Sequence, residues 1–146
     1  MKKLLISAVL TVLIATSSFA ADGKELNSKV VSNFSQEFKH AKNVTWKSTE
    51  NFVKASFILN DKSMAAFYDL DGNMIGTTSN IAIDDLPTNA KRAFAKKYAE
   101  YTVKEAIQFD GVEETAYFIS AESEKQTLLL KVSVAGFVSV LEHANK

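Results

Sequence analysis

The fold of this chain is decided by the stretch from Ser63 to Gly76, which reads SMAAFYDLDGNMIG. An apolar, aromatic run enters the pair Asp71-Gly72, and a second apolar run leaves it. A tight turn between antiparallel strands needs positive φ angles, which Asp-Gly adopts at low cost. The pattern therefore predicts a β-hairpin with its turn at Asp71-Gly72.

A second stretch of the same kind runs from Leu128 to Val140, with Ala135-Gly136 at its turn. Each stretch follows a segment with helical spacing of apolar residues. The first helix is expected over residues 22–40, and the second follows the start signal Asp84-Asp85-Leu86-Pro87-Thr88. Strand-like alternation fills the rest of each half.

The sequence thus predicts an α+β fold in a single domain, residues 21–146, built from two tandem repeats. Repeat 1 covers about residues 22–83 and repeat 2 about residues 84–146. Each repeat is a helix followed by an antiparallel meander. Together they would form one sheet of about eight strands with both helices on one face.

The first hairpin also sorts side chains between the two faces of the sheet. A tight turn at Asp61-Lys62 would pair Asn60 with Ser63 and set Lys54 opposite Asp69. Opposite charges across two strands stabilise by roughly 0.2–1 kcal/mol, and a slip of one residue would exchange the faces. Trp46 could lie on either face. The face expected to be buried carries Val53, Ala55, Phe57, Ala66, Tyr68 and Leu70.

Aligning the repeats gives the same assignment of faces. The alignment matches Phe34 and Phe38 with Phe94 and Tyr98, Val44 and Trp46 with Ile107 and Phe109, Val53 and Ala55 with Tyr117 and Ile119, Ala66, Tyr68 and Leu70 with Leu130, Val132 and Val134, and Phe67 and Asp69 with Lys131 and Ser133.

The N-terminus has the features of a secretory signal peptide. A basic head containing Lys2 and Lys3 precedes an apolar run from Leu4 to Ile14, and Ser18-Phe19-Ala20 suits a signal peptidase. We expect cleavage after Ala20, removal of residues 1–20, and a periplasmic or extracellular product. The apolar run is well short of the ~20 residues needed to span a bilayer, so no membrane anchor is expected after cleavage.

Composition excludes several classes of function. Cleavage removes two of the 17 basic residues and none of the 17 acidic ones, which leaves a net charge of about −2. This balance provides no basic footprint for nucleic acid. The chain contains no Cys, which excludes disulfides, a thiolate nucleophile, Cys-ligated metal and a lipid anchor at the cleavage site.

No catalytic, cofactor or metal site is predicted. Asp69, Asp71 and Asn73 resemble the start of a calcium loop, but an EF-hand would need Gly and Glu where the chain has Met74 and Asn80. The Asp-Gly pair is therefore interpreted as a turn. His40 and His143 have no further ligands at metal-binding spacing. No phosphate loop or nucleophile-elbow motif is present.

Several short motifs follow one another in a fixed order along the chain: the aromatic first helix, Asn43-Val44-Thr45-Trp46, Phe67-Tyr68-Asp69-Leu70-Asp71-Gly72-Asn73, Ile75-Gly76-Thr77, Leu86-Pro87 and Tyr98. This order resembles the secreted bacterial β-lactamase-inhibitor-like, PepSY-like family. The resemblance covers about residues 30–142 and implies a sheet whose open face can bind another protein, as in proteins that inhibit enzymes, with no catalytic residues.

The open sheet face is the candidate binding surface, because aromatic side chains set among charges are typical of protein interfaces. The alternative is that its rings are covered by the other repeat, by Trp46 or by a second copy of the chain. The predicted function is a secreted, non-enzymatic protein-binding module, for example an inhibitor or regulator of a secreted or periplasmic enzyme. The alternatives are a small-ligand carrier or enzyme with an unrecognised pocket, and an envelope structural or folding-helper protein. The candidate residues are Phe52, Lys54, Phe67, Asp69, Phe118 and Lys131.

Overall fold

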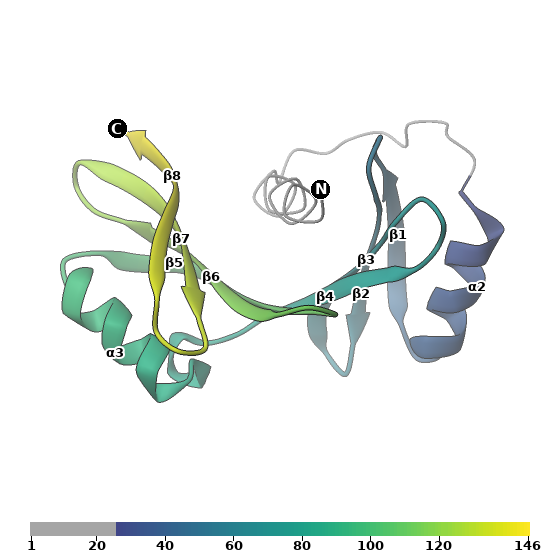
Figure 1. Cartoon of the computed structure of the whole chain (residues 1–146), viewed down its shortest axis with the longest axis horizontal. Helices are drawn as coiled ribbons and strands as arrows, with labels where there is room; N and C mark the ends of the chain where they lie inside the picture. Colours follow the sequence, from purple (N-terminus) through teal and green to yellow (C-terminus); the bar gives the residue numbers. More distant parts are fainter. Residues whose placement is uncertain (1–25) are drawn as a thin grey trace. The chain divides into compact units, whose positions relative to one another are not determined.

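The computed structural model describes residues 26–146. The predicted signal peptide and the first residues of the predicted helix lie outside this range. The fold is α+β, with one antiparallel sheet of eight strands in the order β1 to β8 (Figure 1), which confirms the predicted class. Within residues 26–146, no helix is long and apolar enough to cross a membrane. The elements are α2 (Ser28–Glu37), β1 (Lys42–Ser48), β2 (Val53–Leu59), β3 (Lys62–Tyr68), β4 (Met74–Asn80), a 3₁₀ turn (Ile83–Asp85), α3 (Thr88–Lys97), β5 (Thr102–Gly111), β6 (Thr115–Glu122), β7 (Gln126–Ser133) and β8 (Val138–Asn145).

The chain divides into two compact units, which meet between Thr77 and Thr78 inside β4. In the first unit, α2 is capped at its N-terminus by Asn27, whose side chain accepts a hydrogen bond from the Lys29 backbone N–H at 2.9 Å. Asn is a favoured residue here because its oxygen satisfies one of the N–H groups that the first turn leaves unpaired. Val30 and Phe34, one turn apart, are the buried residues of the helix.

The core of the first unit lies between α2 and one side of β1, β2 and β3. Its centre is Phe34, whose ring centroid lies 5.1 Å from those of Phe38 and Trp46 and 5.0 Å from that of Phe57. Edge-to-face contacts of this kind add to the stabilisation from burial. Trp46, which the sequence left on either face, therefore lies on the helix side of the sheet.

The predicted register of the β2–β3 hairpin is wrong, but the predicted faces are right. The turn lies at Asn60 and Asp61, which have φ angles of 51° and 62°, and Leu59 pairs with Lys62. Each residue of β2 therefore pairs with a residue of β3 two positions away from the predicted one. A shift of two leaves every side chain on its predicted side of the sheet, because side chains alternate between the two sides. Lys54 lies opposite Phe67, so the predicted Lys54–Asp69 pair does not form.

The hairpin of β3 and β4 closes through a longer loop than the predicted Asp-Gly turn. β3 ends at Tyr68 and β4 begins at Met74. Gly72, with φ of +88°, lies against Lys29 of α2, where an added Cβ would be 3.1 Å from Lys29 Cγ. Leu70 lies in this loop and is 49% exposed, so its predicted place in the core is wrong.

The second unit repeats this loop. In the β3–β4 loop, Asp69 N–H donates to Asn73 O and Gly72 N–H donates to Asp69 O. In the loop between β7 and β8, Ser133 N–H donates to Phe137 O and Gly136 N–H donates to Ser133 O in the same pattern. Gly136, with φ of +93°, lies against Asn89 of α3. The same closure and the same close approach to a helix thus confirm the predicted repeat.

The core of the second unit lies between α3 and one side of its strands. It contains Phe94 of α3, Ala106 of β5 and Ile119 of β6. Ile107 and Phe109 alternate with Ala106 and lie on the other side of β5. Their predicted match with Val44 and Trp46, which lie on the helix side, is therefore wrong. In β5 the residue that pairs with Ile119 is Ala106, just as Trp46 pairs with Ala55 in the first unit, so Ala106 is the equivalent of Trp46.

The two outer strands of the sheet are irregular. In β1 the pairing with β2 shifts between Lys42 and Thr45, where Asn43 has φ of 53°. In β8 the pairing with β7 shifts opposite Leu129 and Leu130. An extra residue in one strand of a pair produces a β-bulge and increases the local twist.

Candidate protein-binding face

In each unit, one side of the strands packs against the helix of that unit, and we call the other side of its strands the helix-free face. In the first unit it carries Phe52, Lys54, Ala65, Phe67 and Ile75; in the second it carries Ile107, Phe109, Phe118, Leu129 and Lys131. The sequence-predicted residues other than Asp69 all lie on this face.

The turn before β2 places Phe52 on the helix-free face. Thr49 closes this turn: its backbone N–H and hydroxyl both donate to Phe52 O, and its hydroxyl oxygen accepts from Phe52 N–H at 3.1 Å. The rings of Phe52 and Phe67 then meet, with centroids 5.9 Å apart. Ala65 and Ile75 complete the cluster.

Each repeat places one lysine beside one phenylalanine at equivalent positions, with the residue types exchanged. Lys54 of β2 lies opposite Phe67 of β3, and its ammonium nitrogen is 5.8 Å from the ring centroid. Phe118 of β6 lies opposite Lys131 of β7. A cation over an aromatic face is attracted by the ring quadrupole. Lys131 also donates to Glu114 at 2.6 Å.

The aromatic rings expected to be open to solvent are buried. Phe67 is 0%, Phe52 2% and Phe118 3% exposed. Phe118 contacts Phe109, with centroids 6.5 Å apart. The absence of a side chain at Gly111 leaves room for Phe109, because an added Cβ would lie 2.5 Å from its ring. The burial agrees with the alternative interpretation of this face, in which its aromatic rings are covered and do not contact solvent.

Asp69 is the predicted site residue that lies away from this face. Its carboxylate closes the β3–β4 loop by accepting from the backbone N–H groups of Asp71 at 3.0 Å and Asn73 at 2.8 Å, and from Asn73 Nδ2 at 2.9 Å. Partial burial acts to raise the pKa of Asp69, but hydrogen bonds from Asn73, Asp71 and Gly72 together hold it below the ordinary value of 3.8. The carboxylate is thus occupied within its own loop.

We expect Asp69→Asn to destabilise the protein by about 1 kcal/mol at pH 7, because an amide oxygen accepts these hydrogen bonds less strongly than a carboxylate. A lowered folded-state pKa means that the stabilisation is complete above the unfolded value and is lost as pH falls through the folded one. Urea unfolding at several pH values should therefore show the difference from the parent at pH 7 and its disappearance well below pH 3.8.

The matched control for this prediction is Asp71→Ser, which removes the neighbouring charge but none of the acceptors that close the loop. A difference that persisted unchanged into acid would contradict the role given to the Asp69 carboxylate.

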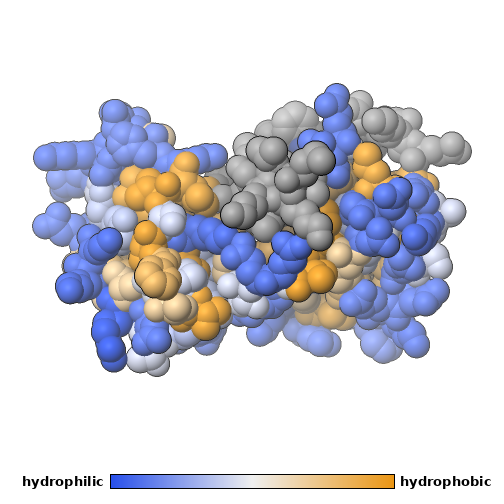
Figure 2. Space-filling view, in the orientation of Figure 1, coloured by the Kyte–Doolittle hydropathy of each residue, from blue (hydrophilic) through white to orange (hydrophobic). Residues whose placement is uncertain are grey.

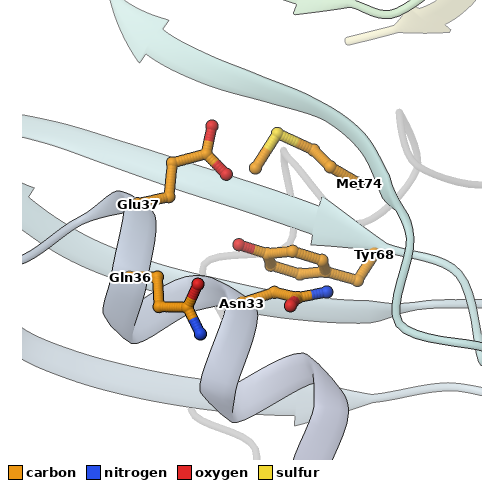
Figure 3. Close-up of a pocket in the computed structure, with 5 residues that line it drawn as sticks. All are labelled: Asn33, Gln36, Glu37, Tyr68 and Met74. Atoms are coloured by element: carbon orange, nitrogen blue, oxygen red, sulfur yellow. The ribbon is translucent and has the colours of Figure 1, made fainter.

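A pocket in the first unit was missed by sequence reasoning. It has a volume of about 310 Å³ and is lined by Asn33, Gln36, Glu37, Tyr68 and Met74 (Figure 3). The sequence signal that could have indicated it is a tyrosine at a core position, since a buried tyrosine hydroxyl usually needs a hydrogen-bond partner.

The two histidines, His40 and His143, are exposed. Among residues 26–146, no three His, Cys, Asp or Glu side chains come together in a way that could hold a metal ion. The carboxylate oxygens of Asp69 are already occupied by hydrogen bonds from residues of its own loop.

Comparison with known proteins identifies structural relatives only. No family model matches the sequence, and no curated protein matches it. A proposed periplasmic protein from Bacteroides eggerthii is similar at 15% identity over 84% of this chain and 90% of that chain, with a TM-score of 0.74. A DUF2874 family protein from Bacteroides ovatus is similar at 19% identity over 84% and 89%, with a TM-score of 0.73.

A third structure, a BLIP-like protein from Bacteroides fragilis, is similar at 16% identity over 85% of this chain and 89% of that chain, with a TM-score of 0.69. At these identities the likeness is one of fold. It supports the β-lactamase-inhibitor-like part of the resemblance as a statement about architecture.

Proposed function

We propose that the protein is a secreted, non-enzymatic module that binds an acidic surface of another protein through its helix-free face. The observation that carries the proposal is the row Lys47–Lys54–Phe67, in which three residues lie directly opposite one another across β1, β2 and β3. The Lys54 ammonium over a buried ring, with Lys47 next to it in the row, combines electrostatic steering with a rigid apolar base. In the second unit, Ile107, Phe118 and Lys131 form a corresponding row.

The burial of the rings changes their role in this proposal. Phe52, Phe67 and Phe118 support the surface from beneath, and the lysines meet the partner. Similarity in fold to a BLIP-like protein and to a proposed periplasmic protein supports a binding role outside the cytoplasm. The PepSY-like part of the resemblance adds a partner class to this proposal: the protein bound at the helix-free face would be a secreted enzyme whose activity is restrained.

The test is capture of partners from an envelope extract by the immobilised protein. Lys54→Glu combined with Lys131→Glu should abolish capture of an acidic partner, and raising the salt concentration should weaken capture by the parent, because exposed charges are screened. Thermal unfolding must show that the double variant is folded, because both lysines are half-buried and Lys131 pairs with Glu114.

The matched control is Lys39→Glu with Lys96→Glu, which makes the same change in net charge at two exposed residues on the helix side. If this control also lost capture, the loss would be caused by the change in net charge and not by the position of the lysines. Unchanged capture by Lys54→Glu with Lys131→Glu would contradict the assignment of the helix-free face.

A further inference from the structure

The pocket beside α2 contains a hydroxyl group that has no hydrogen-bond partner within residues 26–146. Tyr68 is 0% exposed, and no group in this range bonds to its buried phenol oxygen. In Figure 3 the hydroxyl points toward the end of α2 that carries Glu37. Buried polar side-chain atoms are nearly always paired, so this oxygen marks a place where a partner belongs.

The other polar groups of the pocket are two amides and a carboxylate. Asn33 uses its amide nitrogen to donate to Gly72 O at 2.8 Å, and Gln36 uses its own to donate to Ser32 Oγ at 3.3 Å. Each amide keeps a second N–H and a carbonyl oxygen, so it can donate or accept, whereas the carboxylate of Glu37 can only accept when ionised. The ligand group that complements Glu37 is therefore a donor.

The charge of the pocket specifies the donor further. Burial raises the pKa of Tyr68 to about 12, and the negative charge of Glu37 adds to the rise. The phenol is thus neutral at physiological pH, and Glu37 supplies a negative charge. Gln36 and Glu37 lie in the last turn of α2, which contains no basic residue. The carbonyl end of a helix favours positive charge.

The second repeat lacks the arrangement. By the spacing of the matched residues, Val132 occupies the position of Tyr68, Ala93 that of Asn33 and Lys97 that of Glu37. In α3 the last turn carries Lys96 and Lys97. At the matching positions of the second repeat the hydroxyl is thus replaced by an apolar side chain, and the helix end carries ammonium groups of its own.

We propose that the pocket of the first unit binds a primary ammonium group, held by the Glu37 carboxylate, the Tyr68 hydroxyl and the amide oxygens of Asn33 and Gln36. The side chain of Met74 provides an apolar wall for the methylene groups that follow the nitrogen. The site lies apart from the helix-free face and does not depend on the function proposed for that face.

Titration of the ¹⁵N-labelled protein with n-butylammonium, followed by amide chemical shifts, tests the proposal. We expect saturable shifts around Tyr68 and Met74 with a dissociation constant on the order of millimolar, as for a small ligand with one charged contact. Tyr68→Phe and Glu37→Gln should each weaken binding by about tenfold or more, because a hydrogen bond to a charged group is lost. 1-Butanol should produce no saturable shift.

Two controls distinguish the proposal from a structural role. Glu50→Gln removes an exposed charge elsewhere in the first unit and should leave binding unchanged. Tyr68→Phe should keep or raise the midpoint of thermal unfolding, because it removes a buried hydroxyl that has no partner. Equal shifts with butanol, full binding by Glu37→Gln, or a hydroxyl satisfied only by bound water would overturn the proposal.

The ammonium group could come from a free amine or from a lysine in a peptide. Titration with N-acetyl-glycyl-lysyl-glycinamide, and with the same peptide acetylated at its lysine, distinguishes the sources. Binding of the first peptide alone assigns the site to lysine side chains. Binding of butylammonium without either peptide assigns it to free amines.

Discussion

Replacing Phe67 with alanine should lower the free energy of unfolding by about 3–5 kcal/mol, the usual effect of deleting a buried aromatic ring. The side chain is fully buried, contacts the ring of Phe52 and packs with Ala65 and Ile75. Since domains are typically stable by only 5–15 kcal/mol, much of the total stability should be lost. Urea unfolding of the parent and the variant measures the change.

Phe137→Ala is the matched control, because it makes the same change at a ring that is 78% exposed. Its effect should lie within about 0.5 kcal/mol. Phe67→Leu, which keeps most of the apolar volume, provides a folded variant if Phe67→Ala unfolds. A melting curve for Phe67→Ala that matched the parent would show that the ring is dispensable to the core and would restore it as a direct partner contact.

The second large effect is expected for Phe34→Ala, again about 3–5 kcal/mol. Phe34 joins α2 to the sheet through two ring contacts, with Trp46 and Phe57, and its ring also contacts Phe38 at the end of the helix. Trp46 is the only tryptophan in the sequence, so its fluorescence reports on this core. Water admitted beside the indole should move its emission to longer wavelength in the folded variant.

Val31→Ala, on the same helix but at a position that is 36% exposed, controls for changes in helix propensity. It should leave the emission maximum unchanged and the stability nearly so. An unaltered emission spectrum in folded Phe34→Ala would contradict the placement of Trp46 against α2.

The sequence was sufficient to predict the repeat and the faces of the sheet because both follow from periodicity. Val30 and Phe34 are one helical turn apart, and Ala55, Phe57 and Ala66 alternate along their strands. The hairpin register was predicted two residues away from the observed one. Asn60 and Asp61 both adopt left-handed conformations and form the turn. The sequence had predicted the turn one residue later, at Asp61-Lys62.

The burial of the helix-free face was not predicted, although the sequence contains a sign of it. The run Met64-Ala65-Ala66-Phe67-Tyr68 is continuously apolar instead of alternating, and so is Ala116-Tyr117-Phe118-Ile119. Uninterrupted apolar strands are typical of sheets buried on both sides. The structure buries residues 65–68 and 116–119 throughout.

The pocket could not be predicted from the pattern, because it depends on which atoms lack partners. Periodicity placed Tyr68 in the core correctly. Whether its hydroxyl meets an acceptor there depends on distances between α2 and β3, which no spacing rule gives. Asp69 presents the same difficulty, because alternation assigned to a sheet face a carboxylate that instead binds the backbone of its own loop.

The bulges in β1 and β8 have a consequence for how the molecule can associate. These two strands end the sheet, and each presents backbone N–H and C=O groups that could pair with another chain. A residue that breaks the ladder interrupts the regular row of groups that an incoming strand would need. Continuous growth of the sheet from molecule to molecule is thereby discouraged, so a crowded population of these proteins should resist fibrous aggregation at its outer strands.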